Sequence, residues 1–371
     1  MIVNTESLKD ISSKILAAVD TSEISTITET LEMIVVDCNL YITVTNKEYC
    51  VQTRLYLGYN EEFHATVNAK LFLNLVSKTT TEDIELLIED NALIVRGNGS
   101  YKIPLIYDGE QLLVLPFIEV ENPTCDFFIK GSTLNSILKY NSKELSKGVI
   151  SHPVQKLYYI DQCGAITFTS GACVNSFDLD QPVKFLLSGK VVKLFKLFPD
   201  DEVKFTLGHS AVGDGRMQTR VKFESADTIL TAIIPGDENL INAVPAKMIR
   251  DMADSVYPYQ VTINKDALLQ ALGRLLIFRN SASSVQPIGT FTFGETEVVI
   301  SDGGKGNQEN LVYDAADGLT GQSYKMMLYL SDLKTTLETY PDSHLTIGFG
   351  NQKSIAISKA NIKMIIPECG D

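Results

Sequence analysis

Residues 189–207 read "GKVVKLFKLFPDDEVKFTL", a helical run that is followed by an acidic turn and an alternating strand. Related stretches occur at residues 69–96, "AKLFLNLVSKTTTEDIELLIEDNALIVR", and at residues 331–358, "SDLKTTLETYPDSHLTIGFGNQKSIAIS". In each stretch an amphipathic segment ends at an acidic turn that contains Thr or Pro, and strands with a period of two residues follow. Three occurrences of one pattern predict a chain built from repeated domains.

A second helical pattern precedes each of these stretches. It reads "LKDISSKILAAV" from Leu8, "STLNSILKYNSKEL" from Ser132 and "KDALLQALGRLLIF" from Lys265. Alternating runs that are typical of antiparallel strands separate the two helices of each copy. The sequence therefore predicts an α+β fold of three repeated domains, each with two helices and antiparallel sheets. Pro and polar residues interrupt the pattern near two positions, which places the domains at 1–122, 123–258 and 259–371.

The composition is that of an ordinary globular protein, and the net charge is strongly negative. The chain has 371 residues, 44% of them hydrophobic and 21% charged, and a formal net charge of −14. We expect a soluble, cytoplasmic protein, since the first residues lack the pattern of a secretory signal and no apolar run approaches the ~20 residues of a membrane-spanning helix. Six cysteines occur singly, which is not the spacing of a zinc site.

The positive charge is concentrated on the predicted helices. Taken together, the helices at 8–19, 68–78, 130–145, 188–198, 264–280 and 329–340 contain more Lys and Arg than Asp and Glu, although the whole chain is acidic. A single lysine face is usually only a solvated surface. Basic faces on helices of three repeated domains are better explained by a polyanion that contacts them all. The candidate contact residues are Lys70, Lys139, Lys143, Lys190, Lys193, Lys196, Arg274 and Arg279.

This arrangement resembles the bacterial β sliding clamp, the processivity factor of the replicative DNA polymerase. The closest likeness is in "ATVNAKLFLNLVSKTTTEDIELLIEDNALIVRGNGSYKIPL" at 65–105, where the family has a helix, a strand and a short edge strand. "AITFTSGACVNSF" at 165–177 stands where the family has a Thr-Asp-Gly turn, and "MIIPECGD" at 364–371 stands where the family chain ends. The resemblance covers the whole chain in pattern, although the individual motifs are degenerate.

The resemblance implies a fold and a function. In the family, two three-domain protomers close head to tail into a ring, so this chain would be half of a closed ring. The homodimer would encircle double-stranded DNA without reading its sequence and tether the DNA polymerase and the clamp loader, which bind through short peptide motifs. It would act in DNA replication in the cytoplasm of a bacterial cell or of a phage-infected cell.

The resemblance also implies a partner-peptide pocket between the second and third domains. Its residues would be Val154, Thr169, Gly171, Val174, Ile241, Ala243, Met364, Ile366 and Pro367. Three features depart from the family pattern. Ala172-Cys173 replaces His-Arg after the turn glycine, and Glu368-Cys369-Gly370 replaces the terminal Met-Arg-Leu. The Pro and Arg of the family's Phe-Pro-Asp-Tyr-Arg-Arg-Val segment are missing from "PGDENLINAVP" at 235–245. These departures suggest a phage-encoded or otherwise divergent clamp with an altered motif preference, a hypothesis that chromatography of host proteins on this chain would test.

The protomer interface would pair an edge strand of the first domain with the third domain. The resemblance assigns Tyr101, Ile103 and Leu105 to one side of this interface and Ile277 and Phe278 to the other. An exposed edge strand such as "SYKIPLIY" favours aggregation unless another strand covers it. Pairing across two protomers would cover it and close the ring by two-fold symmetry.

No motif in the sequence requires catalysis, a cofactor or a metal. "SDGGKGNQEN" at 301–310 lacks the Gly-Lys-Ser/Thr ending of a phosphate-binding loop and is better read as a hairpin tip. We therefore expect a protein that is not an enzyme and has no cofactor. Two alternatives stay open, namely an acidic three-domain scaffold that binds proteins without encircling DNA, and an enzyme with a site of scattered carboxylates.

Overall fold

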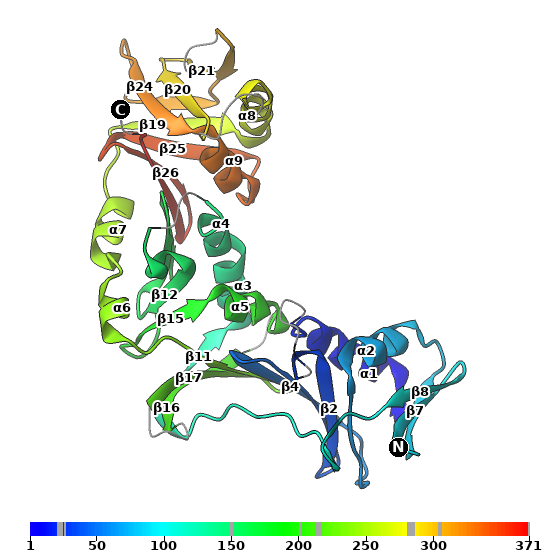
Figure 1. Cartoon of the computed structure of the whole chain (residues 1–371). Coiled ribbons are helices and arrows are strands. Elements are labelled where there is room, and N and C mark those ends of the chain that lie inside the picture. The colour runs from blue at the N-terminus through cyan, green and yellow to red at the C-terminus, as the bar shows by residue number, and fades with distance from the viewer. Residues whose placement is uncertain are drawn as a thin grey trace. The chain divides into compact units, whose positions relative to one another are not determined.

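The computed structural model describes residues 1–20, 25, 27–147, 151–199, 202–211, 217–279, 286–302 and 306–369. The chain forms two compact units. Unit 1 comprises Met1–Asn135 and Lys190–Gly236, and unit 2 comprises Ser136–Gly189 and Asp237–Asp371. Both units combine antiparallel sheets with helices (Figure 1). The predicted α+β class is confirmed.

Unit 1 contains a four-stranded sheet of order β1-β6-β7-β8, an eight-stranded sheet of order β11-β16-β17-β18-β4-β3-β2-β5 and the pair β10-β9. Helices α1 and α2 pack against each other, and α1 also packs on β4. The elements are β1 (Ile2–Asn4), α1 (Thr5–Leu16), η1 (Ile27–Glu29), β2 (Thr30–Val36), β3 (Asn39–Thr45), β4 (Tyr49–Tyr56), β5 (His64–Asn68), α2 (Ala69–Lys78), β6 (Asp83–Glu89), β7 (Ala92–Arg96), β8 (Ser100–Pro104), β9 (Tyr107–Asp108), β10 (Gln111–Leu112), β11 (Asn122–Lys130), η4 (Lys193–Leu197), β16 (Glu202–Ala211), β17 (Met217–Glu224) and β18 (Thr228–Ile233).

Unit 2 contains a nine-stranded sheet of order β15-β12-β13-β14-β27-β26-β25-β19-β23 and a four-stranded sheet of order β22-β21-β20-β24. Two further helices, α3 (Gly131–Ser136) and α5 (Gly189–Val192), span the unit boundaries. The elements are η2 (Ile137–Asn141), α4 (Ser142–Glu144), η3 (Pro153–Lys156), β12 (Leu157–Asp161), β13 (Gly164–Phe168), β14 (Ala172–Ser176), β15 (Lys184–Ser188), α6 (Glu238–Asn242), α7 (Ala246–Ala253), β19 (Tyr259–Asn264), α8 (Lys265–Arg279), β20 (Ile288–Phe293), β21 (Glu297–Ser301), β22 (Gln308–Val312), β23 (Ala315–Asp317), β24 (Tyr324–Tyr329), α9 (Leu330–Glu338), β25 (His344–Asn351), β26 (Ser354–Lys359) and β27 (Ile362–Pro367).

Three helices start in the same way, from an asparagine that ends a strand. The side-chain oxygens of Asn4, Asn68 and Asn264 accept hydrogen bonds from the backbone N–H groups of Ser7, Leu71 and Ala267 at 3.0, 3.0 and 2.9 Å. Each bond satisfies one of the N–H groups that the first helical turn leaves without a partner. This junction of strand, asparagine and helix recurs in the first and third predicted domains.

Two of the predicted helices are irregular. Residues 130–145 form α3, a π-helical turn η2 and the short α4, while 188–198 divide into α5 and the 3₁₀ segment η4. At the end of the π turn, buried Asn141 donates hydrogen bonds to the Thr167 hydroxyl and the Cys173 carbonyl. Insertions of this kind interrupt the α-helical ladder, and the spacing of apolar residues does not reveal them.

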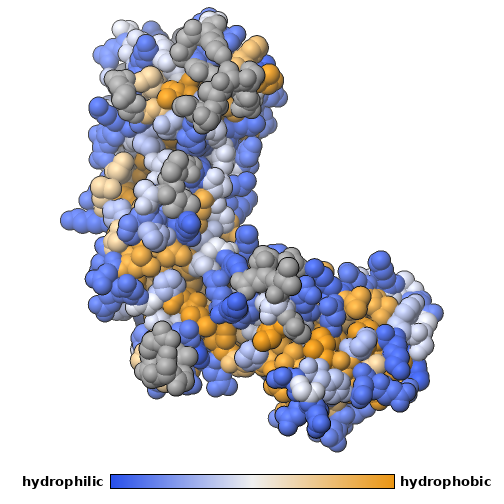
Figure 2. Space-filling model, viewed as in Figure 1, coloured by the Kyte–Doolittle hydropathy of each residue, from blue (hydrophilic) through white to orange (hydrophobic). Residues whose placement is uncertain are grey.

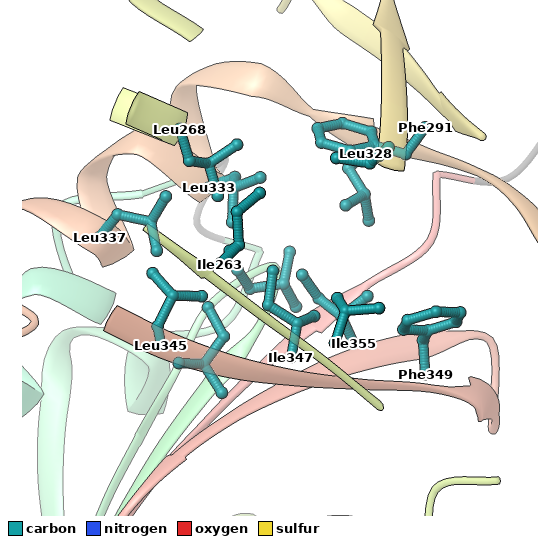
Figure 3. Packing of buried hydrophobic residues seen from close by; sticks show 14 of the residues in the cluster. Ile263, Leu268, Phe291, Leu328, Leu333, Leu337, Leu345, Ile347, Phe349 and Ile355 are labelled. Atoms are coloured by element: carbon teal, nitrogen blue, oxygen red, sulfur yellow. The ribbon is translucent and has the colours of Figure 1, made fainter. Parts of the chain in front are cut away.

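One core of unit 2 lies between two helices and two sheets. Leu268 of α8 and Leu333 of α9 point toward Ile347 of β25 and Ile355 of β26 (Figure 3). Phe349 is fully buried, and its ring stacks on Phe293 at 4.1 Å between centroids. The leucines recur at helical spacing and the sheet residues at a spacing of two, as the sequence pattern predicts.

The predicted domain boundaries at 122/123 and 258/259 stay a prediction. The eight-stranded sheet joins β2–β5 from before residue 122 with β11 and β16–β18 from after it. The nine-stranded sheet likewise joins β12–β15 from before residue 258 with strands from after it. Each sheet therefore continues across a predicted boundary. A division of the chain by compactness gives two units, and the limits of these units fall inside the predicted domain 123–258.

An ion pair ties α1 to the turn before β18 in unit 1. The Lys14 ammonium lies 2.7 and 2.9 Å from the Asp227 carboxylate oxygens. Partial burial opposes ionisation of Asp227, but the hydrogen bonds from Lys14 and Thr228 outweigh it and lower the pKa of the carboxyl below 3.8. A lowered pKa stabilises the fold above the unfolded-state value, and this contribution is lost as the pH falls through the folded-state value.

We therefore expect the Asp227→Asn variant to be destabilised at pH 7 by about 0.5 kcal/mol, since the pair is partly exposed and screened. The difference from the wild type should shrink towards zero as the pH falls below about 3.8. Urea unfolding from pH 7 to pH 3 measures it. A difference that is the same at both ends of this range would show that the ionised pair does not contribute.

Candidate nucleic-acid and partner-binding surfaces

The segment 189–198 has the amphipathic character that its sequence predicts. Val191, Phe195 and Phe198 are fully buried, while Lys193 and Lys196 are exposed. Among the other predicted contacts, Lys70 on α2 and Lys139 on η2 are exposed, and Lys143 on α4 is half-buried. The five lysines make no ion pair within the part of the chain that the structure describes. Their charge is therefore available to an external anion: Lys70, Lys139, Lys143, Lys193 and Lys196.

Two other predicted cation sites are already engaged by carboxylates. The Arg274 guanidinium makes two hydrogen bonds of 2.7 Å to Glu309 of β22, and these lower the pKa of the Glu309 carboxyl. The Lys190 ammonium lies 3.1 Å from Asp20. Both contacts reduce the charge that these residues offer to a polyanion. The side chain of Arg279 lies outside the described residues.

Unit 2 has an apolar cavity with a volume of about 190 Å³. It lies between the turn that joins β13 to β14, the helix α7 and the strand β27. Two methionines of α7 line it, and Met248 is 57% exposed. The full lining is Phe168, Thr169, Ser170, Gly171, Ala172, Pro245, Met248, Ile249, Met252, Ile365 and Pro367.

Of the predicted pocket residues, Thr169, Gly171 and Pro367 line this cavity. Val154 and Val174 lie behind its wall, in the apolar cluster that also contains Ile249 and Ile365. Ile241 packs against that cluster from α6, and Ala243 is exposed at the end of α6. The sequence pattern missed α7, whose short amphipathic run "AKMIRDMA" supplies Met248, Ile249 and Met252.

The structure corrects the assignment of β27. Met364 and Ile366 belong to the core between α8, α9 and the sheet, whereas Ile365 and Pro367 line the cavity. Because successive side chains of a strand point to opposite faces, a shift of one residue moves the whole set to the other side. The apolar run "IKMIIP" shows no alternation in polarity, so the sequence does not reveal the register.

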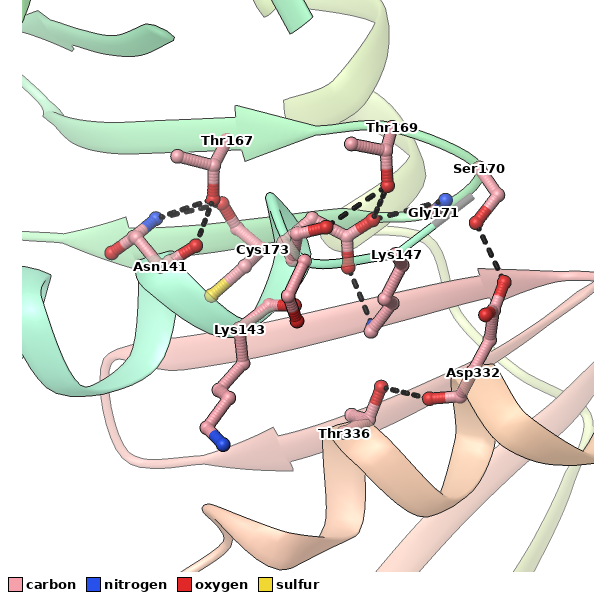
Figure 4. Close-up of polar contacts among 12 residues, drawn as sticks. Asn141, Lys143, Lys147, Thr167, Thr169, Ser170, Gly171, Cys173, Asp332 and Thr336 are labelled. Atoms are coloured by element: carbon pink, nitrogen blue, oxygen red, sulfur yellow. Dashed lines mark hydrogen bonds and ion pairs between the residues drawn. The ribbon is translucent and has the colours of Figure 1, made fainter. Parts of the chain in front are cut away.

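The turn Thr169–Ser170–Gly171, the pocket turn, is held by buried polar side chains (Figure 4). One oxygen of the Glu144 carboxylate accepts hydrogen bonds from the Thr169 hydroxyl at 2.8 Å and from the Gly171 N–H at 3.1 Å. The Ser170 hydroxyl donates to Asp332 at 2.8 Å. A Cβ atom on Gly171 would lie 2.3 Å from the Ile365 carbonyl oxygen, so only glycine allows this approach of turn and strand.

The predicted interface residues lie on an edge strand, directly after it and at the end of a helix, and they differ in exposure. β8 is an edge strand of its sheet and β22 is an edge strand of another. Tyr101 on β8 is half exposed, whereas Ile103 is buried in its own unit and Leu105 forms an isolated bridge with Val67. Ile277 and Phe278 at the end of α8 are 68% and 52% exposed.

Other exposed apolar residues are distributed over the surface. Hydrophilic residues predominate on the face that Figure 2 shows, and apolar residues gather there over β2 and β4. Val36 at the end of β2 is one of the exposed large apolar residues. β2 and β4 belong to unit 1, and the chemistry of the apolar residues over them indicates no specific ligand.

Within the described ranges, no group of three or more His, Cys, Asp or Glu residues could hold a metal ion. All six cysteines lie in those ranges, and each is free. β21 and β22 pair as an antiparallel hairpin, which confirms the hairpin prediction for "SDGGKGNQEN", although residues 303–305 lie outside the described part. No helix in the described part of the chain is long and apolar enough to cross a membrane.

No protein-family model matches this chain, and no curated protein is similar to it in sequence. Solved structures match it along its full length. A putative DNA polymerase III β subunit from Eubacterium rectale has a TM-score of 0.76 at 15% identity, and the DNA polymerase III β subunit from Thermotoga maritima has 0.77 at 15%. The DNA polymerase III β subunit from Pseudomonas aeruginosa has 0.78 at 12%. Each comparison covers 100% of this chain and 99% of the other. The chain therefore has the fold of DNA polymerase III β subunits, as the sequence resemblance implied.

Proposed function

We propose that the chain is a DNA sliding clamp, a processivity factor that encircles duplex DNA and tethers a replicative DNA polymerase. The observation that carries the proposal is the concentration of free lysines on helical segments of a chain with this fold and a net charge of −14. We propose no catalytic role and no cofactor. The protein would act in the cytoplasm of a bacterial or phage-infected cell, where the replicating DNA is.

The lysines suit a protein that holds DNA and slides along it. Lysine–phosphate contacts are sequence-independent, whereas contacts to base edges would favour particular sites and stop movement. An ammonium on a long flexible stem acts as a mobile point charge, in contrast to the fixed fork of an arginine. The engagement of Arg274 by Glu309 leaves lysine as the main free cation of these segments. The acidic remainder would disfavour DNA on other faces.

The ring would form from two copies of the chain. We propose that β8 of one protomer approaches the third domain of its partner beside Ile277 and Phe278. Edge strands have unpaired backbone groups that a second strand can satisfy. Two such contacts related by a two-fold axis would close a ring and cover the exposed apolar residues at the end of α8.

The cavity beside α7 would hold partner proteins. Its lining is mostly apolar, with a few polar groups from the pocket turn, which fits an apolar side chain of a short peptide segment. The methionines Met248 and Met252 have flexible side chains that adapt to different partners. We propose that the polymerase and the clamp loader bind here through such motifs.

Topological linkage to DNA tests the proposed function without a loader. The protein is incubated with a linear duplex that is anchored to a bead at one end, and the free end is then capped with a bulky protein. We expect retention at about 0.5 M salt, where phosphate contacts are weak, and release when a nuclease cuts the duplex. Equal loss from capped and uncapped DNA would rule out encirclement and leave a protein-binding scaffold as the better interpretation.

The lysine faces are tested by reversing their charge. In the Lys193→Glu/Lys196→Glu variant, we expect the salt dependence of DNA affinity to fall by a slope of about 2, roughly one for each lost phosphate contact. Lys184→Glu is the control for a single charge reversal, because this lysine is exposed on strand β15. An equal effect per substitution of the strand and helix variants in fluorescence anisotropy titrations would contradict a specific role of the helices.

A further inference from the structure

One buried carboxylate, that of Glu144, holds the backbone N–H of the pocket turn. Within the described residues, the Gly171 N–H donates only to Glu144, at 3.1 Å, and the same oxygen accepts from the Thr169 hydroxyl at 2.8 Å. The other buried partners hold different atoms, since Asp332 accepts from the Ser170 hydroxyl and Gln155 donates to the Thr169 carbonyl. Glu144 therefore fixes the direction of the backbone N–H at the residue that faces both the cavity and strand β27.

Glu144 is held in turn by a buried cation. The Lys147 ammonium lies 2.6 Å from the second carboxylate oxygen, and the two side chains are 4% and 2% exposed. Removing two charges from water has a large cost, and an apolar pair of similar size is often equally stabilising. A contribution to the free energy of unfolding therefore does not explain why the chain has this buried ion pair. The hydrogen bonds that it makes to the pocket turn provide a geometric reason.

We propose that Glu144 is a positioning residue for partner recognition, which sets the shape of the cavity through the pocket turn while Lys147 holds its carboxylate in place. The inference rests on the proposed function of the cavity as a partner site. It adds a residue that does not line the cavity and lies on α4, next to Lys143. Loss of the Gly171 hydrogen bond would leave this N–H without its partner and let the turn reorient.

Two double variants separate positioning from the effect of an unpaired charge. Glu144→Gln/Lys147→Met is neutral and keeps an amide oxygen that accepts from Thr169 and Gly171. Glu144→Leu/Lys147→Met is also neutral but has no side-chain acceptor, so the Gly171 N–H loses its partner, while the Thr169 hydroxyl can still donate to the backbone carbonyl of residue 144 at 3.0 Å. Since neither variant has a buried charge without a partner, both should unfold cooperatively, and comparison of the two isolates the hydrogen bonds to the turn.

Binding is read with a defined probe, the tightest peptide from a displayed random decapeptide library that binds the wild type but not Met248→Glu. We expect the Gln variant to bind within about twofold of the wild type and the Leu variant about tenfold more weakly, as loss of a partly buried hydrogen bond predicts. Amide hydrogen exchange at Gly171 should increase in the Leu variant alone. If the Leu variant does not fold, Thr169→Val replaces it, because this change removes the contacts of the Thr169 hydroxyl with the side chain and the backbone carbonyl of Glu144 and leaves the ion pair intact.

The outcomes distinguish the inference from the proposed function. Equal peptide affinity in both double variants, or unchanged Gly171 exchange in the Leu variant, would overturn the positioning role. If no library peptide depends on Met248, the partner function of the cavity fails. In that case exchange at Gly171 still decides whether Glu144 orders the turn.

Discussion

A variant with Ile277→Asp and Phe278→Asp is expected to be monomeric under conditions in which the wild type is a dimer. Both side chains are mostly exposed at the end of α8, so the substitutions should leave the fold of unit 2 intact. In the proposed interface the two carboxylates would be buried without partners, and the desolvation cost of several kcal/mol would weaken the dimer by about 1,000-fold. Light scattering across a range of protein concentrations measures the mass of each species against the 40.9 kDa chain.

The same variant should also lose its retention on end-capped DNA, because an open half ring has no topological link. Val256→Asp is the matched control, since Val256 is 83% exposed in the segment between α7 and β19 and lies outside the proposed interface. We expect the control to dimerise and to stay on capped DNA. A wild type that is monomeric at every concentration would contradict the closed ring in solution, and a dimeric double variant would place the interface elsewhere.

The helices could be predicted from the sequence because their apolar residues repeat at helical spacing and their starts follow a recurring strand. The two irregular helices show the limit of this approach. The π turn that ends at Asn141 depends on hydrogen bonds to Thr167 and Cys173, which are 26 and 32 residues away. Helical periodicity contains no information about such distant partners. The short helix α7 was missed because its eight residues barely exceed two turns.

The candidate DNA contacts were predicted from the distribution of charge. The structure reduces their number, because it shows that some of the predicted cations are paired with carboxylates. The sequence does not indicate that Arg274 and Lys190 are paired with carboxylates, because their acidic partners lie 35 and 170 residues away. Only the folded chain brings Glu309 of β22 beside α8. A count of cations on a helix therefore overestimates the charge that the helix offers, most of all in a chain with an acidic excess.

The cavity could be located approximately from the family resemblance, but its lining could not. Strand β27 alternates between cavity and core, and its residues Met364, Ile365 and Ile366 are all apolar. Where both faces of a strand are buried, polarity gives no register. The contact of Gly171 with Ile365 fixes the register in the structure and suggests a decisive substitution.

Gly171→Ala is expected to disrupt the cavity. The new Cβ atom would lie 2.3 Å from the Ile365 carbonyl oxygen, and backbone on a paired strand cannot move aside as a flexible side chain does. The added methyl group should force β14 away from β27, at the point where these strands join the two halves of the nine-stranded sheet. We expect a loss of about 1–3 kcal/mol in the free energy of unfolding and about 100-fold weaker binding of the selected peptide.

Gly273→Ala is the matched control because it makes the same change where there is space. Gly273 lies in α8, and no atom comes within 4 Å of an added Cβ. Alanine there should stabilise the protein by about 0.5–1 kcal/mol, since it restricts the unfolded chain and favours the helix. Both substitutions restrict the unfolded chain to the same extent. If urea unfolding gives changes of opposite sign in the free energy of unfolding, the difference therefore comes from the folded state. If both variants were stabilised, the contact between the pocket turn and β27 would be looser than the structure shows, and the cavity would not need glycine at this position.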